Sequence, residues 1–191
     1  MIDMKILLLL ALMVLALARP GSAADLADKL RGGDHVLLMR HGEAPGVGDP
    51  PNLRLGDCST QRNLDAAGRQ QARAVGVLLK QQGLTEARVF TSPWCRCQDT
   101  ARLLDLGPVT IEPALASFFN DPQLAAATTA AWRAVVARTL DGQKGKPVIM
   151  VTHHVNILDI LGENIASGEM VLARVDRQGR VLSYQRLRAP G

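Results

Sequence analysis

Four residues that could bind and attack an anion stand directly after, or a few positions beyond, short apolar runs: Arg40, His41, Arg96 and His153. In open α/β sheets, ligand sites lie just beyond the carboxyl ends of the strands. Arginine makes paired contacts with phosphate oxygens, and histidine can act as a nucleophile, a base or a ligand. Because like charges repel when they are desolvated, we expect this cationic cluster to surround a bound dianion such as phosphate.

The elements that must position these residues alternate between strands and helices. Apolar runs predict strands over residues 35–39, 88–91, 109–112 and 148–152. Helical spacing and end signals predict helices over residues 25–30, 65–82 and 155–161, with two more that start at Ser92-Pro93 and at Asp121-Pro122. A turn at residues 176–179 predicts a final hairpin of strands 170–175 and 181–187. This order predicts an α/β fold, a three-layer αβα sandwich with a mostly parallel central sheet.

The first residues have the pattern of a secretory signal peptide. Lys5 precedes an apolar run over residues 6–18, and small residues follow up to Ala23. The run is shorter than the ~20 residues that a membrane span needs, so we favour cleavage over a retained anchor. We therefore expect a signal peptide over residues 1–23, a domain over residues 24–191 and a periplasmic or secreted protein that contacts the membrane only through the signal peptide.

Composition limits the partners. A chain of 191 residues suits one domain with one core. Aromatic residues make up 3%, and the net charge of +4 comes from scattered rather than clustered basic residues. This combination argues against a nucleic-acid partner and favours a phosphorylated small molecule or glycan as the substrate.

A long polar loop and three cysteines lie near the expected site. The loop, residues 43–62, follows His41 directly, so we expect it to form one side of the site. Export favours a disulfide, and Cys97 shares an apolar helical face with Trp94. The pairing Cys58–Cys95 is therefore favoured, with Cys58–Cys97 as the alternative. A zinc site is disfavoured because the spacing lacks a paired-ligand motif.

Four ordered segments within residues 35–162 resemble the histidine phosphatase superfamily, the phosphoglycerate-mutase-like group (branch 1). These segments are residues 40–43 (RHGE), 63–72 (NLDAAGRQQA), 91–101 (TSPWCRCQDTA) and 151–154 (VTHH). Each alone is a weak signal, but the ordered set is specific. Residues 58–63 and 94–97 resemble the small exported members, which include the lipopolysaccharide core heptose phosphate phosphatases.

The resemblance implies roles for individual residues. His41 would be the nucleophile that becomes phosphohistidine, while Arg40, Arg96 and His153 would hold the phosphoryl oxygens. It implies no metal or other cofactor, because these side chains supply the positive charge. His154 stands where the family usually has glycine. It would extend the phosphate pocket, meet the leaving group or serve the structure.

The proton donor and the role of Arg62 remain open in the sequence. In the mutase branch a glutamate follows a leucine by two positions, whereas Leu115 here is followed at that distance by Ser117. Asp121 is the nearest downstream carboxylate, although it suits a helix cap better. Glu43, next to the nucleophile turn, is a second candidate. Arg62 either contacts phosphate or is a solvated loop residue.

These observations lead us to expect an exported phosphomonoesterase that works through phosphohistidine. The substrate expected is a sugar phosphate or an envelope glycolipid phosphate, because no large insertion between residues 109 and 147 covers the pocket. The alternative is a non-catalytic anion-binding protein on the same scaffold. A mutase is disfavoured because it needs the carboxylate that Ser117 replaces.

Overall fold

A computed structural model of the chain describes residues 24–141 and 145–190. The predicted signal peptide, residues 1–23, lies outside them. Within the described ranges, no helix is long and apolar enough to cross a bilayer. The elements in chain order are α2 (Ala24–Arg31), β1 (His35–Arg40), the 3₁₀ turn η1 (Cys58–Thr60), α3 (Ala66–Gln81), β2 (Arg88–Thr91), α4 (Cys95–Leu103), β3 (Val109–Ile111), the 3₁₀ turns η2 (Pro113–Leu115) and η3 (Pro122–Leu124), α5 (Ala125–Leu140), β4 (Val148–Thr152), α6 (His154–Leu161), β5 (Met170–Val175) and β6 (Val181–Leu187).

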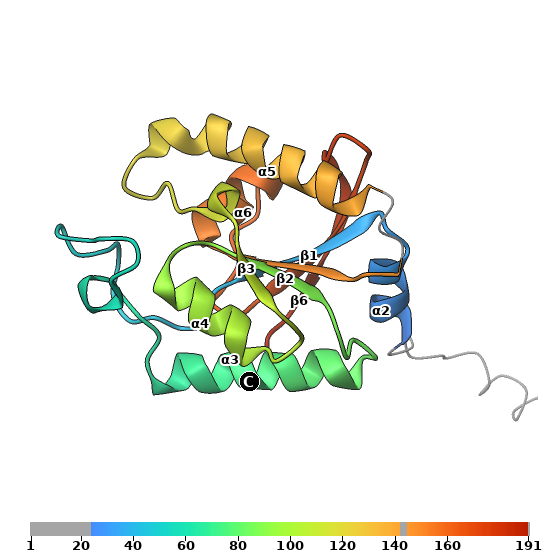
Figure 1. Ribbon diagram of the computed structural model, residues 1–191, viewed down its shortest axis with the longest axis horizontal. Coiled ribbons are helices and arrows are strands. Elements are labelled where there is room, and N and C mark those ends of the chain that lie inside the picture. Colours follow the sequence, from blue (N-terminus) through green and yellow to red (C-terminus); the bar gives the residue numbers. More distant parts are fainter. Residues whose placement is uncertain (1–23, 142–144, 191) are drawn as a thin grey trace, which may run out of the picture.

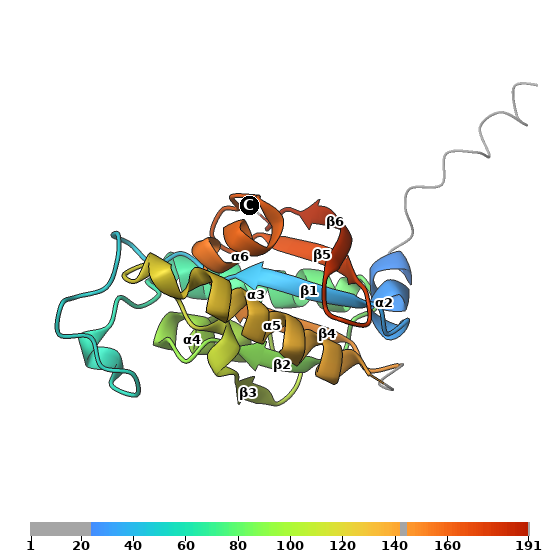
Figure 2. The same cartoon turned by 90° about the horizontal axis from the view of Figure 1, so that it is seen from above.

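One sheet runs through the middle of the molecule (Figure 2). Its strand order is β3-β2-β4-β1-β5-β6. The pairs β1–β4, β2–β4 and β2–β3 are parallel, whereas β5 and β6 form the predicted hairpin and run antiparallel. The predicted α/β fold with a mostly parallel sheet is thus confirmed. Since β1, β2 and β4 are parallel neighbours, their carboxyl ends meet at one edge.

Helices cover both faces of the sheet (Figure 1). Alternate side chains of β1 pack in two different apolar clusters, because successive side chains of a strand point to opposite faces of the sheet. Leu37 and Met39 pack in the cluster that contains α2, α3 and α4 side chains. Val36 and Leu38 pack in the other, with residues of α5 and α6. All four are fully buried, so the strand that carries the nucleophile turn is held from both sides.

Helix starts show where local signals succeed and where they fail. Asp65 caps α3 as predicted, its Oδ1 accepting a hydrogen bond from the Gly68 amide at 2.7 Å. The helix predicted to start at Ser92-Pro93 instead begins at Cys95, and the Ser92 hydroxyl contacts both the Trp94 amide and His153. Asp121 precedes a 3₁₀ turn rather than a helix and makes no side-chain cap bond.

Candidate active site

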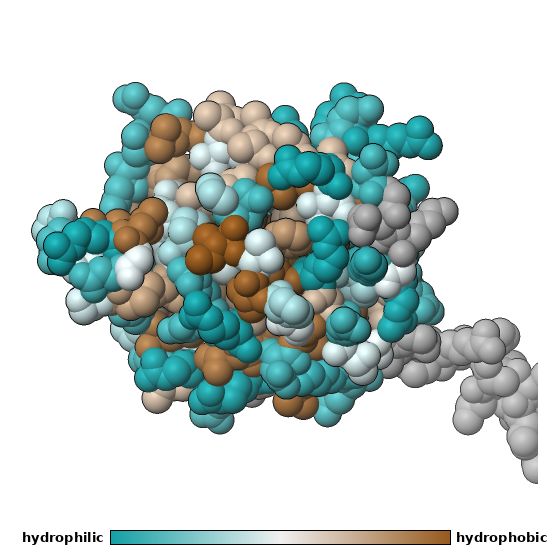
Figure 3. All heavy atoms as spheres, in the orientation of Figure 1, coloured by the Kyte–Doolittle hydropathy of each residue, from teal (hydrophilic) through white to brown (hydrophobic). Residues whose placement is uncertain are grey.

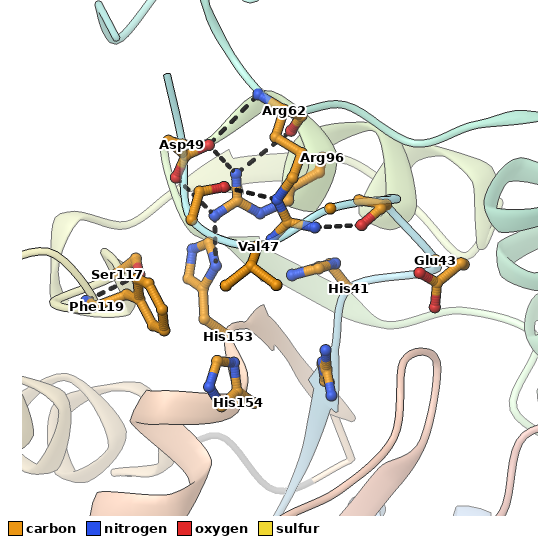
Figure 4. A pocket seen from close by; sticks show the side chains of 14 residues that line it. His41, Glu43, Val47, Asp49, Arg62, Arg96, Ser117, Phe119, His153 and His154 are labelled. Carbon is orange, nitrogen blue, oxygen red and sulfur yellow. Dashed lines mark hydrogen bonds and ion pairs between the residues drawn. The ribbon is translucent and has the colours of Figure 1, made fainter. Parts of the chain in front are cut away.

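The strand-end residues line one pocket of about 250 Å³ (Figure 4). All seven residues expected at the site border it: Arg40, His41, Glu43, Arg62, Arg96, His153 and His154. The loop of residues 43–62, called the site loop below, forms one side of the pocket, as expected. Ser117 and Phe119 border it from the segment between η2 and η3.

His41 is held in the form that a nucleophile needs. The side chain is buried, and its Nδ1 lies 2.7 Å from the carbonyl oxygen of Gly42. A carbonyl only accepts, so Nδ1 carries the proton and donates it, which leaves Nε2 with a free lone pair. Burial, and then the charges of Arg96 and Arg40, lower the pKa of His41 to about 3. Its imidazole is therefore neutral at physiological pH.

The turn after His41 depends on close backbone packing against α3. A Cβ on Gly42 would lie 2.7 Å from the Gly68 carbonyl oxygen, and a Cβ on Gly68 would lie 1.9 Å from that of Glu43. Glycine is needed at both positions because only hydrogen fits there. Gln71 accepts from the Glu43 amide at 3.0 Å and donates to Ser167 at 2.8 Å. The segment 63–72 thus fixes the turn that holds the nucleophile.

His153 lies beside His41, with ring centroids 5.4 Å apart in an edge arrangement. Its Nδ1 is 3.4 Å from Nη2 of Arg96, which can only donate, so Nδ1 accepts and Nε2 carries the proton. Nε2 donates to the Ser92 hydroxyl at 2.8 Å. Burial, and then the positive surroundings, lower the pKa of His153 well below its ordinary value. Ser92 thus contacts a site residue, whereas the sequence predicts only a helix start at this position.

Arg96 is paired with Asp49, a residue that the sequence did not single out. Nη1 and Nη2 of Arg96 lie 2.6 and 3.0 Å from the two Asp49 oxygens, and both side chains are almost fully buried. Trp94 donates to the same carboxylate at 3.0 Å. Burial acts to raise the pKa of Asp49, but the hydrogen bonds and charge of Arg96 outweigh it and hold that pKa below its ordinary value. The polar composition of the site loop was the only signal pointing toward Asp49.

Two guanidinium groups keep a buried N–H available. The Nε atoms of Arg40 and Arg96 are buried and have no hydrogen-bond partner within residues 24–141 and 145–190. Nη1 of Arg40 donates to the carbonyl oxygen of Ile165, at 2.8 Å. Unpaired buried donors cost free energy. Both arginines line the pocket, so an anion bound there is suited to accept from their guanidinium groups.

Arg62 supports the site loop as well as bordering the pocket. It is half-buried, and its guanidinium donates to the carbonyls of Gly48, at 2.7 Å, and of Ala44. Of the two alternatives left open for Arg62, these contacts do not fit a solvated loop residue. Burial, and then the charge of Arg96, lower the pKa of Arg62 from its ordinary value.

A disulfide ties the site loop to the start of α4. It joins Cys58 to Cys95, the pairing favoured from the sequence, and Cys97 is a buried free thiol. Burial raises the pKa of Cys97 to about 12, so this thiol stays protonated. Within the part of the chain that the structure describes, no group of three or more His, Cys, Asp or Glu residues is placed to hold a metal ion.

The proton-donor candidates fall into two groups. Glu43 borders the pocket but is exposed. Asp121 is exposed and does not line the pocket, so the structure does not bring it to the site. Ser117, which takes the position of the mutase glutamate, does line it.

Comparisons with known proteins agree with this geometry. Residues 36–121 match the model of the histidine phosphatase superfamily (branch 1). A 70-residue stretch, 37% of this chain, is 36% identical to the mitochondrial serine/threonine-protein phosphatase Pgam5 of Drosophila grimshawi. The chain covers 22% of that relative's length.

Solved structures share the fold at low sequence identity. The protein histidine phosphatase SixA in complex with tungstate is 20% identical, with a TM-score of 0.54 over 80% of this chain and 96% of that one. The mycobacterial glucosyl-3-phosphoglycerate phosphatase in complex with VO3 is 15% identical, with a TM-score of 0.55 over 80% and 97%. These structures show the fold, and the family match over residues 36–121, with the Arg-His-Gly turn at the end of β1, shows that the chain carries a domain of the histidine phosphatase superfamily, branch 1.

Proposed function

We propose that this protein is a phosphatase that hydrolyses phosphate monoesters through a phosphohistidine on His41. The observation that carries the proposal is the state of His41: a buried, neutral imidazole whose Nδ1 is fixed by the Gly42 carbonyl. Its Nε2 is then a nucleophile in a pocket lined by arginines. Two of the similar structures hold tungstate and VO3, oxyanions that resemble phosphate, which supports an anion in this kind of pocket.

In the first step, Nε2 of His41 attacks phosphorus and the ester oxygen leaves. Negative charge on the phosphoryl oxygens is stabilised by the guanidinium groups of Arg40 and Arg96, whose buried Nε–H groups are free to donate. His153 contributes by holding Nη2 of Arg96. Water then attacks the phosphohistidine and releases phosphate. Because the arginines supply the positive charge, the proposed reaction needs no metal.

For the substrate, we propose a sugar phosphate or an envelope glycolipid phosphate. The connection between β3 and α5 contains only the turns η2 and η3, so this connection inserts no subdomain over the pocket within residues 24–141 and 145–190. An accessible mouth suits a bulky alcohol portion. A strong kinetic preference for small free metabolites over glycan phosphates would exclude the glycolipid.

We also propose that the protein is exported after cleavage near residue 23. The Cys58–Cys95 disulfide supports this, because structural disulfides persist in oxidising compartments. Fractionation of cells expressing the full chain, followed by N-terminal sequencing of the product, tests it. Recovery of uncleaved chain from the cytoplasm would contradict export.

Labelling that is quenched with alkaline detergent tests the phosphohistidine. We expect wild type incubated with a ³²P-labelled aryl phosphate to retain acid-labile, base-stable label, and His41→Ala to retain none. His35→Ala is the matched control, because His35 begins β1 at the end away from the pocket and pairs with Asp34 at 2.6 Å. Phosphate binding without label or turnover in wild type would support the rival, an anion-binding protein on the same scaffold.

A further inference from the structure

His154 differs from the other histidines of the chain in having free ring nitrogens. His35, His41 and His153 each bond a side chain or carbonyl through the ring. The ring of His154 makes no hydrogen bond within residues 24–141 and 145–190, although it is half-buried and lines the pocket. An imidazole held in a pocket without a protein partner is available to a substrate.

The pocket mouth beside His154 is apolar. Val47, on the site loop, is 89% exposed, and Phe119, on the opposite side, is 41% exposed. The Phe119 ring lies 5.8 Å from the His154 ring at an angle of 59°. Figure 4 shows these side chains converging on the pocket from separate segments. Figure 3 shows hydrophobic atoms where the projecting loop meets the body, in contrast to its hydrophilic tip.

This difference in polarity orients a phosphate ester. The dianionic phosphoryl group belongs with Arg40 and Arg96, whose buried N–H groups lack partners. The alcohol portion then extends toward Val47 and Phe119, where apolar surface is favoured to contact apolar surface. The ester oxygen joins these two parts. His154 borders the same pocket as Arg40 and lies beside Phe119, so its ring can reach an oxygen that joins the two parts of the ester.

The carboxylates of the pocket are less suited to meet the leaving group. Asp49 is engaged by Arg96 and Trp94, which stabilise its ionised form. Glu43 is exposed to water, and its backbone amide anchors it to Gln71 of α3, away from Phe119 (Figure 4).

We propose that His154 is a further catalytic residue, the acid that protonates the ester oxygen as the phosphorus–oxygen bond breaks. The inference rests on the phosphatase function proposed above. In the first step the His41–phosphorus bond forms and the ester bond breaks. The protonated imidazole of His154 gives its proton to the departing alcohol oxygen. In the second step the neutral His154 takes a proton from the attacking water while the His41–phosphorus bond breaks. The imidazolium is thereby regenerated and phosphate is released.

The electrostatics of the pocket allow this cycle. Burial, and then the charges of Arg40, Arg62 and Arg96, lower the pKa of His154 from its ordinary value. A phosphoryl dianion bound among those arginines offsets their charge and so favours the protonated imidazole. Binding of the substrate thus favours the protonated form of His154 that the first step requires.

The dependence of kcat/KM on leaving-group basicity tests the proposal. General acids matter most for poor leaving groups and typically contribute 10²–10⁴-fold. We expect kcat/KM of His154→Gln to fall about 10²-fold on hexyl phosphate. On 2,4-dinitrophenyl phosphate the fall in kcat/KM should be about tenfold or smaller. Glutamine keeps hydrogen bonding but cannot transfer a proton. Imidazole added to His154→Ala should restore part of the lost activity on hexyl phosphate.

Glu43→Gln is the matched control, since it removes the other candidate acid from the same pocket. We expect its loss to be equal for both esters. An equal loss for both esters in His154→Gln, with no imidazole rescue of His154→Ala, overturns the role of His154 while wild-type turnover upholds the phosphatase. A steeper leaving-group dependence in Glu43→Gln than in His154→Gln assigns the acid to Glu43 instead. Wild type that neither turns over an aryl phosphate nor forms labelled His41 overturns both proposals.

Discussion

The two sides of the pocket are held in place by different means. The floor, made of Arg40, His41 and His153, continues directly from buried strands, and Arg40 is in register with Thr152 across the β1–β4 pair. The site loop has no regular structure apart from η1 and depends on contacts with distant residues. The position of the floor is therefore set by the sheet, whereas the position of the loop is set by individual side-chain bonds.

Arg96 belongs to both sides. It stands in the first turn of α4, close to His153, and it pairs with Asp49 of the site loop. A movement of the site loop would therefore move the Arg96 guanidinium relative to His153.

Arg96→Ala should have the largest effect, because Arg96 contacts both the floor and the site loop. We expect kcat/KM to fall about 10³-fold, since a charged donor to the phosphoryl group is lost. The free energy of unfolding should also fall by about 3 kcal/mol, because Asp49 is left buried and unpaired. Adding Asp49→Ala should restore stability but not activity. Activity that recovers together with stability would show that Arg96 serves the structure alone.

Removing the disulfide tests how far the site loop depends on its anchor. Cys58→Ser with Cys95→Ser frees a connection that spans a sequence separation of 37, so we expect a loss of about 3 kcal/mol in urea unfolding. Wild type unfolded with a reducing agent should match the double variant. Equal unfolding free energies for oxidised wild type and the double variant would mean that other contacts hold the loop.

The buried floor should make stability depend on pH. The pKa of His41 is about 3 in the folded protein and ~6.5 when unfolded. Below pH 6.5 the unfolded chain binds a proton that folded His41 does not. The free energy of unfolding is therefore highest above pH 6.5 and decreases as pH falls toward 3. Between pH 7 and pH 5 this amounts to about 2 kcal/mol. His41→Asn should reduce the pH dependence by that amount. A pH dependence unchanged in the variant would place the His41 pKa near its ordinary value.

Asp49→Asn should have the smallest of these effects. Asparagine keeps one acceptor for Arg96 but loses the charge, so Arg96 is held less firmly. We expect kcat to fall about tenfold with no rise in KM, because removing a negative charge does not weaken anion binding. Asp57→Asn is the control on the same loop, since Asp57 contacts Ser59 and Arg54 at the surface and does not line the pocket. Equal losses in the two variants would contradict a specific role for Asp49.

The sheet and its strand-end residues were predictable from the sequence. Short apolar runs encode buried strands locally, and the polar residue after each run marks its end. The start of α3 was predictable for the same reason, because Asp65 and Gly68 are close in the chain. The contact at the start of α4 was not, because the Ser92 hydroxyl bonds His153, which is 61 positions away.

Local patterns specify strands and their ends, so the fold class and the locations of His41, Arg96 and His153 followed from the sequence. The pairing of Asp49 with Arg96 and the place of His154 beside Phe119 depend on tertiary packing. These contacts join residues between 35 and 47 positions apart, and no local spacing encodes them. The Arg-His-Gly turn places the nucleophile, and packing of distant segments decides which groups surround it.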